Sequence, residues 1–385
     1  MNYYISNLSM LCANGVSNDE IMTNLSNANS AIKEHNGYMV GKINDLKRDK
    51  IFNKLEKCFD TRTNHILYET IKKSGIEEII DKYGKENIAV IVGNTTSGVE
   101  ENLNRIKAEG SDFLKDKKEV ELFMSMNSLS NPALFVKNLY GLENLAYSIS
   151  TACTSGIKTL LEGMNLLKNG FCKAVVCAGV DSVNTLTLKG FDSLDILSSK
   201  HIKPFSDDRE GTNLAEGACV FVLSNEKRKD SIKILSAFSN NDAFHITKPN
   251  TNCELQKELI SSALKEAGLK SVDYVNLHGT GTISNDEMEA ILVREFFDGV
   301  SVSSTKSLMG HTLGACGALE LGVCYELILR SKNGECLLPA QPNFINNEKL
   351  NIVKSGNKKV VKTALSTSFA FGGDNAVVVL GDSDE

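Results

Sequence analysis

Short apolar runs and longer stretches of helical periodicity alternate along most of the chain. Residues 157–167 place apolar side chains at helical spacing. Because alternating strands and helices pack as layers around a shared sheet, this pattern predicts an α/β protein. The runs that resemble buried strands are 87–93, 173–180, 218–223, 274–277 and 359–365.

Cys153 stands immediately before the helix predicted at 157–167, in the small-residue segment Thr151–Ser155. The unpaired amides and the positive dipole end of a helix N-terminus favour an anion, so this setting predicts a lowered thiol pKa. The same amides can bind an oxyanion. A cysteine among small residues also fits an inert buried side chain, which is the common fate of this residue type.

Two histidines occupy similar surroundings, rich in glycine and threonine. His278 comes directly after the apolar run 272–277, and His311 lies between a strand-like segment, 301–305, and a small-residue helix, 312–321. Loops at strand ends often carry reactive side chains. One such histidine alone fits a satisfied core imidazole, but two together indicate a site. A thiol and two imidazoles can hold an acyl group covalently and support carbon chemistry on it.

Composition narrows the class of protein. The 385 residues are 42% hydrophobic, which is ample for a large core, and the net charge of −6 argues against a nucleic-acid partner. No apolar run approaches the roughly 20 residues of a membrane-spanning helix. The first residues lack a signal-peptide pattern, so we expect a cytoplasmic protein without membrane insertion. The ten cysteines show no paired CxxC arrangement, which predicts reduced thiols and no structural metal.

With these motifs, the chain resembles the elongating β-ketoacyl-acyl-carrier-protein synthases of the thiolase superfamily. The resemblance runs from about Ile5 to Leu380 and rests on three segments, Thr151–Ser155, His278–Thr282 and Lys306–His311. Within that family the chain is most similar to the ketosynthases of bacterial aryl polyene biosynthesis. The segments that carry this narrower likeness are 90–98, 241–247, 303–317 and 368–373.

The resemblance implies a duplicated thiolase fold with five layers, α-β-α-β-α. Residues 1–206 would form an N-terminal half that carries Cys153, and residues 207–385 a C-terminal half that carries both histidines. Direct comparison of the two halves of the sequence reveals no repeat. The resemblance also implies a dimer, formed either by two copies of this chain or by this chain and a chain-length factor.

The implied reaction has two stages. Cys153 first takes an acyl group from the phosphopantetheine thiol of an acyl carrier protein. Malonyl-acyl carrier protein then loses carbon dioxide, while His278 and His311 donate hydrogen bonds to the thioester oxygen of the developing enolate. The enolate attacks the acyl-Cys153 thioester, whose oxyanion is held by the backbone amides of Cys153 and Phe371. The product is a lengthened 3-oxoacyl chain, and the resemblance implies no cofactor beyond the phosphopantetheine of the carrier protein.

Supporting residues carry over from the family by position. Lys306 matches a lysine near the catalytic histidines, and Glu289 matches its carboxylate partner, which a buried lysine needs. Glu289 also fits a solvated helix face. Thr280 and Thr282 would bind the amides of the phosphopantetheine arm, with Thr247 as a further contact. On the residues alone, these are ordinary turn threonines.

Phe371 lies in the glycine-rich turn 368–375, between two strand-like segments. In the family this phenylalanine is a gate beside the cysteine, and the two glycines that follow it give the loop its freedom. A core phenylalanine on a hairpin is the alternative. Many relatives carry threonine or asparagine where this chain has Asp374. A charge at this place can pin the loop or alter which acyl chain is accepted.

Acyl carrier proteins are acidic, so we expect basic docking residues despite the negative net charge. Lys203 precedes Pro204 at a position where relatives carry a basic docking residue. Lys54, Lys57 and Arg62, in an early polar region, are further candidates. Such runs are also typical of plain solvated faces.

Two other functions fit the same fold. A noncatalytic subunit of the chain-length-factor type pairs with an active ketosynthase, but such subunits usually lack the cysteine that is present here as Cys153. Initiating synthases and degradative thiolases commonly have an asparagine in place of one histidine, or a second cysteine near the C-terminus. The loop after Phe371 has no such cysteine. The sequence therefore predicts an acyltransferase of the condensing type, in fatty acid, aryl polyene or other polyketide biosynthesis.

Overall fold

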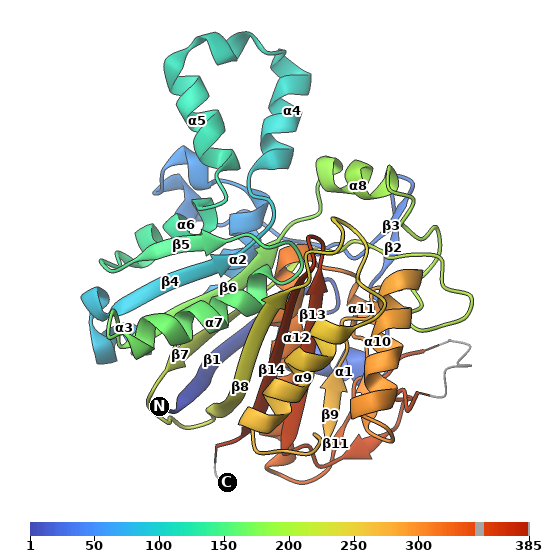
Figure 1. The fold of residues 1–385 in the computed structure, drawn as a ribbon. Helices are drawn as coiled ribbons and strands as arrows, with labels where there is room; N and C mark the ends of the chain where they lie inside the picture. Colours follow the sequence, from blue (N-terminus) through green and yellow to red (C-terminus); the bar gives the residue numbers. More distant parts are fainter. Residues whose placement is uncertain (343–349, 384–385) are drawn as a thin grey trace.

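A ten-stranded mixed sheet forms the centre of the protein, in the strand order β10-β9-β13-β14-β8-β1-β7-β6-β4-β5 (Figure 1). The computed structural model describes residues 1–342 and 350–383. The strands of the first half are β1 (Tyr3–Cys12), β4 (Ile88–Gly93), β5 (Ala146–Ile149), β6 (Ala174–Asp181) and β7 (Gly217–Ser224). Those of the second half are β8 (Ile232–Asn241), β9 (Tyr274–Asn276), β10 (Ser301–Ser303), β13 (Thr363–Ala370) and β14 (Asp374–Asp382).

The two halves of this sheet repeat one topology. Counted from the middle of the sheet, each half places its own strands in the order first, fifth, fourth, second, third. In each half the first three strands in this order pair antiparallel and the remaining pairs are parallel. The expected duplication is therefore visible in the strand order, although the two half-sequences do not show it.

Strand order also shows where one half ends and the next begins. β7 is the fifth strand of the first repeat, and β8 is the first strand of the second. The halves therefore divide within residues 225–231, later than the boundary at 206/207 expected from the sequence. The expected boundary would place β7 in the second repeat. β7 pairs with β1 and β6, which are both strands of the first repeat, and it therefore belongs to the first.

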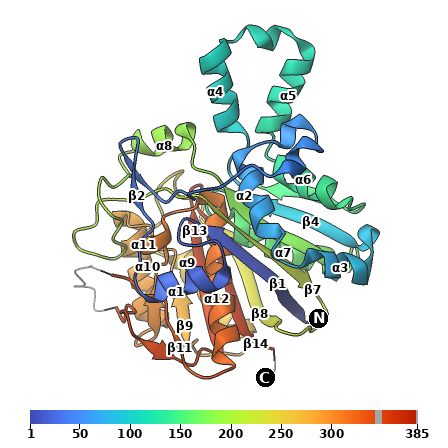
Figure 2. The same cartoon turned by 180° about the vertical axis from the view of Figure 1, so that it is seen from behind.

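Helices cover both faces of the two half-sheets and fill the space between them, as expected for the five layers. α7 (Ser155–Lys168) and α12 (Cys316–Ser331) contact each other and strands of both halves, so they form the central helical layer. α2 (Arg62–Ile71), α3 (Ile76–Tyr83) and α6 (Asn131–Tyr140) lie on the outer side of the first half (Figure 2). α9 (Glu254–Glu266) and α10 (Ile283–Phe296) lie on the outer side of the second.

The two central helices approach each other closely because small residues line their contact. Gly156 of α7 faces Ala318 of α12, and a Cβ at Gly156 would lie 2.8 Å from the carbonyl oxygen of Gly314. A larger side chain at Gly156 would therefore push the two helices apart. This contact brings the segment that precedes α7 next to the segment that precedes α12, and these two segments carry Cys153 and His311.

The remaining elements lie at the periphery. α4 (Val99–Glu109) and α5 (Lys117–Asn127) form a pair that projects from the body at the top of Figure 1. Within residues 1–342 and 350–383, no helix combines the length and the apolar character that crossing a membrane requires. The other elements are α1 (Asn18–Ser26), β2 (Lys33–His35), β3 (Tyr38–Val40), α8 (Thr185–Asp192), α11 (Lys306–Met309), β11 (Cys336–Leu337), β12 (Lys358–Lys359) and the 3-10 turns Lys50–Asn53, Lys57–Phe59, Lys85–Asn87, Asp112–Lys115 and Leu313–Ala315.

Candidate active site

Cys153 occupies a tight turn between β5 and α7, and it therefore lies at a helix N-terminus, as the sequence predicts. Ala152 adopts a left-handed backbone conformation with φ of 55°, which is uncommon for a residue with a side chain. The hydroxyl of Ser155 holds this turn, since it donates to the carbonyl of Ala152 at 2.6 Å and accepts from the amide of Thr151 at 2.9 Å. The strained turn thus presents Cys153 at the start of α7, facing the second half.

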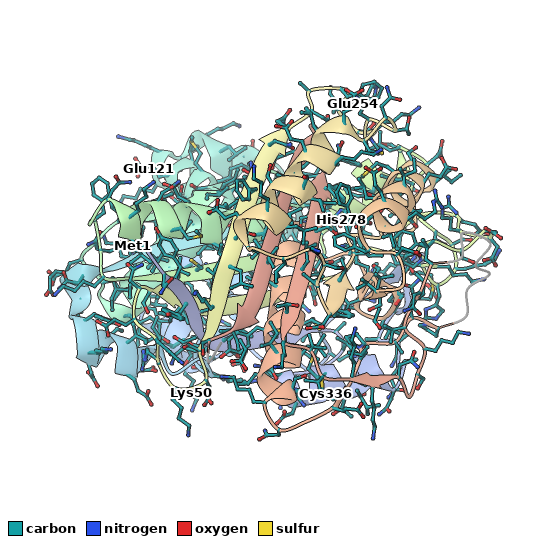
Figure 3. The ribbon with its side chains drawn as sticks, turned by 60° about the horizontal axis from the view of Figure 1, so that its bottom comes forward. Met1, Lys50, Glu121, Glu254, His278 and Cys336 are labelled. Carbon is teal, nitrogen blue, oxygen red and sulfur yellow. The ribbon has the colours of Figure 1, made fainter. Side chains whose placement is uncertain are left out.

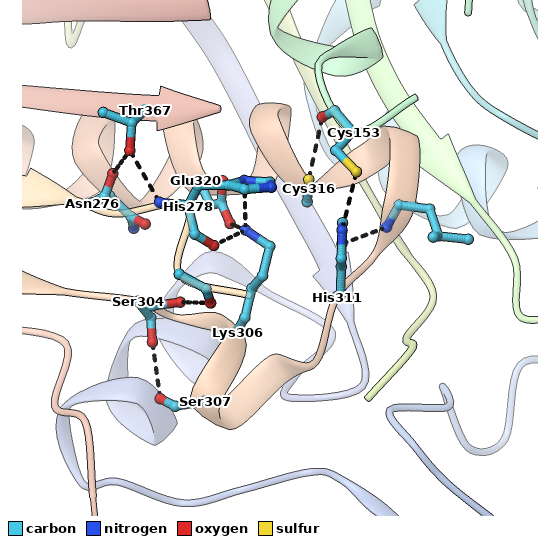
Figure 4. A network of polar contacts seen from close by, with 12 residues as sticks. Cys153, Asn276, His278, Ser304, Lys306, Ser307, His311, Cys316, Glu320 and Thr367 are labelled. Atoms are coloured by element: carbon cyan, nitrogen blue, oxygen red, sulfur yellow. Dashed lines mark hydrogen bonds and ion pairs between the residues drawn. The ribbon is translucent and has the colours of Figure 1, made fainter. Parts of the chain in front are cut away.

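Both predicted histidines meet Cys153 in the interior. His278 follows β9 and His311 follows α11, and their rings lie edge to face with centroids 5.7 Å apart. The Sγ of Cys153 lies 3.1 Å from Nε2 of His311 (Figure 4). In Figure 3, His278 lies inside the second half, whereas the labelled Glu254 lies at the margin. Side chains from three distant segments therefore converge on one site.

The neighbours of the two rings determine which nitrogen carries the proton. Nδ1 of His311 accepts from the backbone N–H of Leu313 at 3.1 Å. Nδ1 of His278 lies 3.2 Å from Nζ of Lys306, and an ammonium group can only donate. Burial, with the charge of Lys306, lowers the pKa of both imidazoles well below the usual value. Each ring is therefore neutral and offers an Nε2–H donor.

The thiol of Cys153 differs from the prediction in one respect. Burial raises its pKa to about 12, although the charge of Lys306 and the backbone N–H groups of Phe371 and Cys153 act in the opposite direction. The predicted lowering of this pKa at the helix N-terminus is therefore wrong, because desolvation outweighs the dipole and the amides. The resting thiol is protonated at neutral pH, and charge on sulfur must be stabilised as it forms.

Lys306 pairs with a carboxylate other than the predicted one. It is fully buried at the start of α11 and forms an ion pair with Glu320 of α12. Its ammonium also donates to the carbonyl of His278 at 2.6 Å. Burial alone would lower the pKa of Lys306, but the Glu320 carboxylate outweighs it and raises that pKa. The predicted pairing of Lys306 with Glu289 is thus wrong.

Glu320 could have been found in the sequence. It is the only acidic residue in the small-residue stretch 312–321, and a charge placed in such a buried helix needs a partner. Spacing from His278 along the chain favours Glu289 instead. In the structure, helix α12 brings the carboxylate of Glu320 to the ammonium of Lys306.

Glu289 has a different structural role. Its two carboxylate oxygens accept from the backbone N–H groups of His278 and Gly279, each at 2.7 Å, and from the hydroxyl of Thr367 at 2.6 Å. Burial raises its pKa to about 7. This carboxylate holds the backbone on which the His278 ring is carried, and it has no cationic partner among residues 1–342 and 350–383.

Phe371 lies beside the cysteine at the tip of the β13–β14 turn. Its ring stacks on Phe191 of α8, with centroids 5.7 Å apart and planes inclined by 21°. Gly372 and Gly373 adopt φ values of 84° and 75°, which favour glycine. A Cβ at Gly373 would also lie 2.2 Å from a carboxylate oxygen of Asp242. The turn therefore requires its glycines, and the ring occupies the position expected of a gate.

A cavity of about 280 Å³ connects these groups with the surface. The predicted phosphopantetheine contacts lie on its wall, and the hydroxyls of Thr280 and Thr282 are 2.9 Å apart. The structure thus brings together the predicted nucleophile, histidines, gate and threonines. The members of the predicted site that line this cavity are Cys153, His278, His311, Phe371, Thr247, Thr280 and Thr282.

The predicted docking residues lie in different environments. Lys54 and Lys57 are exposed, and Lys203 is partly exposed and ion-paired with Asp208. Arg62 is bound inward, because its guanidinium contacts the fully buried carboxylate of Glu216 and donates to a backbone carbonyl at 3.0 Å. The prediction that Arg62 is a docking residue therefore does not hold.

The donor set of the site suits an anion better than a metal ion. The thiol of Cys153 and the rings of His278 and His311 lie close enough together to contact one metal ion. Coordination through Nε2 would require a proton on Nδ1 of each neutral ring. That proton would face the N–H of Leu313 or the ammonium of Lys306. The residues therefore do not fit a metal centre, and they present donors toward the cavity instead.

Comparison with known proteins agrees with this arrangement. Residues 63–229 match the N-terminal domain of the β-ketoacyl synthases, and residues 232–332 match the C-terminal domain. The chain is 29% identical to 3-oxoacyl-[acyl-carrier-protein] synthase 2 of Coxiella burnetii, over 80% of this chain and 78% of that protein. It is also 29% identical to the ketoacyl synthase alpha subunit of the tetracenomycin polyketide synthase of Streptomyces glaucescens, over 82% and 79%.

Solved structures extend the likeness over the whole chain. The structure of the ketosynthase ApeO in complex with its chain length factor ApeC, from Xenorhabdus doucetiae, matches with a TM-score of 0.87 and 30% identity. This match covers 99% of the present chain and 98% of the other. Both domains, the fold and the convergent cysteine and histidines lead to one conclusion: the chain belongs to the β-ketoacyl synthase family.

Proposed function

We propose that this chain condenses an acyl group held on Cys153 with malonyl-acyl carrier protein, to give 3-oxoacyl-acyl carrier protein. One observation carries the proposal. The Sγ of Cys153 lies 3.1 Å from Nε2 of His311 in a cavity that His278 also lines. A nucleophile and two neutral N–H donors therefore face the same space, as covalent acyl transfer followed by enolate formation requires.

The first step is transfer of the acyl group to Cys153. The sulfur attacks the thioester carbonyl of the acyl carrier protein, and the bond to the phosphopantetheine sulfur breaks. The thiol proton leaves with that sulfur, which departs as a free thiol. Because burial disfavours a thiolate on Cys153, the Nε2–H of His311 and the ammonium of Lys306 supply the stabilisation as charge develops.

The second step is decarboxylation. The malonyl carboxylate leaves as carbon dioxide, and its bonding electrons remain on the thioester as an enolate. His278 and His311 donate Nε2–H bonds to the enolate oxygen. Lys306 keeps the proton of the His278 ring on Nε2, because its ammonium donates a hydrogen bond to Nδ1. Glu320 in turn keeps the lysine charged.

The third step forms the carbon–carbon bond. The enolate carbon attacks the acyl-Cys153 carbonyl, and the backbone N–H groups of Cys153 and Phe371 hold the oxyanion of the tetrahedral intermediate. Collapse of this intermediate breaks the bond to Cys153, whose sulfur takes a proton from solvent. The balance is one acyl thioester, one malonyl thioester and one proton consumed, and one 3-oxoacyl thioester, one free thiol and one carbon dioxide formed.

We further propose the partners and the substrate class. The tetracenomycin relative is an alpha subunit, and the ApeO structure contains a chain length factor. The presence of Cys153 favours the active member of such a pair, which assembles as a homodimer or with a chain-length factor.

Likeness to aryl polyene ketosynthases supports an aromatic starter and polyene intermediates as the substrates. Lys203 is our choice for docking of the acidic carrier protein, and we place the reaction in the cytoplasm.

Intact mass spectrometry tests this function. The purified chain, its Cys153→Ala variant and a Cys58→Ala control would each be incubated with an aromatic or a fatty acyl carrier protein. We expect an acyl adduct on the wild type and the control but not on Cys153→Ala. Addition of malonyl carrier protein should discharge the adduct and produce 3-oxoacyl carrier protein. A folded wild type that forms no adduct, alone or with a chain-length factor, would contradict the proposal.

A further inference from the structure

Asp374 connects the β13–β14 turn to the helix that carries the nucleophile. It is the first residue of β14 and follows the turn formed by Phe371, Gly372 and Gly373. One carboxylate oxygen accepts from the hydroxyl of Thr154 at 2.5 Å, and the other lies 2.6 Å from Nζ of Lys158. The Asp374 side chain is 12% exposed, so solvent screens these charge-assisted contacts only weakly.

The partners of Asp374 are the N-cap residue of the nucleophile's helix and a residue one turn later. Thr154 directly follows Cys153 and is fully buried. Lys158 is four residues further, and residues at this spacing lie on one face of a helix. One carboxylate therefore holds the helix both at its start and one turn later.

The position of this contact matters because the two oxyanion donors belong to separate elements. The N–H of Cys153 belongs to the start of α7, in the first half of the fold. The N–H of Phe371 belongs to the β13–β14 turn, in the second half, and both reach toward Sγ of Cys153. An oxyanion hole works only if its donors keep a fixed spacing. Asp374, three residues after Phe371, joins the elements that carry them.

The backbone hydrogen bonds of the turn reach a different part of the protein, the segment that follows β8. The N–H of Gly372 donates to the carbonyl of Ile246 at 2.7 Å, and the carbonyl of Gly373 accepts from the N–H of Asp242 at 2.8 Å. These bonds attach the turn to the segment after β8. The contacts of Asp374, in contrast, join the turn to α7.

We propose that Asp374 is a positioning residue that sets the spacing between the N–H groups of Cys153 and Phe371, through Thr154 and Lys158. The inference rests on the proposed function only in that both use acyl transfer to Cys153.

Two reagents for Cys153 test this proposal. Acylation by a small thioester passes through a tetrahedral oxyanion, whereas alkylation by iodoacetamide is a direct displacement with no oxyanion. The ratio of the two rates therefore reports on the oxyanion hole alone.

The variants are Asp374→Asn, Lys158→Met and the two combined. Asp374→Asn places an amide group against the ammonium of Lys158. Asp382→Asn is the matched control, because Asp382 ends the same strand and pairs with Lys332 at 3.2 Å.

We expect Asp374→Asn and Lys158→Met each to lower the ratio about 10- to 100-fold, part of the effect of losing one oxyanion donor. The double variant should fall no further than the stronger single variant, because both break one contact. The control should keep the wild-type ratio, and Lys158→Arg, which retains the ion pair, should restore most of it.

Two results would overturn the proposal. One is an unchanged ratio, whether both reactions keep their rates or slow equally, and the other is additive losses in the double variant. Failure of the wild type to condense with malonyl carrier protein, while it still takes the acyl group from the thioester, would contradict the proposed function but not this inference.

Discussion

Replacement of Glu320 by glutamine would test how the buried lysine is kept charged. The side chains of Lys306 and Glu320 are each 1% exposed, and the two form an ion pair. Glu320→Gln preserves the shape of the side chain and removes the negative charge. The ammonium is then buried without a counter-ion, which costs about 3 to 5 kcal/mol of unfolding free energy near neutral pH.

Part of this loss should return when the pH is raised. In the wild type, Glu320 raises the Lys306 pKa, so the contribution of the charged lysine is fully present below its unfolded pKa and is not lost between about pH 7 and 9. In the variant, burial acts alone and lowers the Lys306 pKa below its ordinary value. The folded protein then releases this proton before the unfolded chain does, and stability rises with pH between about 7 and 9.

Urea denaturation of Glu320→Gln at several pH values measures both effects. The control is Glu326→Gln on the same helix, where the carboxylate is 3.0 Å from Arg330, whose side chain is 32% exposed. A solvated arginine keeps its charge, so the control should lose about 1 kcal/mol or less at every pH. A Glu320→Gln variant that matches this control near neutral pH, or whose deficit is the same at about pH 9, would refute the reasoning.

Three further predictions concern the carboxylate beneath His278, the two imidazoles and Arg62. Glu289→Gln places an amide group against backbone N–H donors, so condensation should fall about 10- to 100-fold while iodoacetamide still alkylates the nucleophile at the wild-type rate. Because burial lowers the pKa of His278 and His311, the ring C–H signals of both histidines in NMR spectra should show no imidazolium titration near pH 6.5; a ring titration there would contradict neutral rings. Arg62→Ala leaves the buried Glu216 without its cation and should lower the unfolding free energy by about 3 to 5 kcal/mol, while the Kd for carrier protein, measured by calorimetry, stays unchanged.

Much of the fold follows from local signals in the sequence. The runs at 87–93, 173–180 and 218–223 correspond to β4, β6 and β7 within one residue at each end, because continuous apolar runs are typical of strands buried on both faces. The run at 359–365 is less accurate. The strand there, β13, begins at Thr363 and continues to Ala370 through alternating serine and threonine residues, which lack an apolar pattern.

The site shows where local signals fail. Cys153, His278 and His311 lie in segments that identify the family, and the family resemblance predicts that the three side chains meet in one site. Spacing from His278 favours Glu289, whereas the packing of α12 brings Glu320 to Lys306. The one sequence signal for Glu320 is its place as a lone acidic residue in the small-residue stretch 312–321. Likewise, Arg62 looks like a surface cation in the sequence, because its acceptor, Glu216, is far away along the chain.

The pairing of β1 has a consequence for the synthesis of the protein. Of the strands of the central sheet, this one is synthesised first, yet its partners are residues 217–224 of β7 and 232–234 of β8. Its ten residues are buried almost throughout in the finished protein. During translation they remain an unpaired apolar strand until more than half of the chain has emerged, and such edges readily join other chains. The interval between synthesis of Cys12 and of Gly217 is therefore when the nascent chain most needs a chaperone.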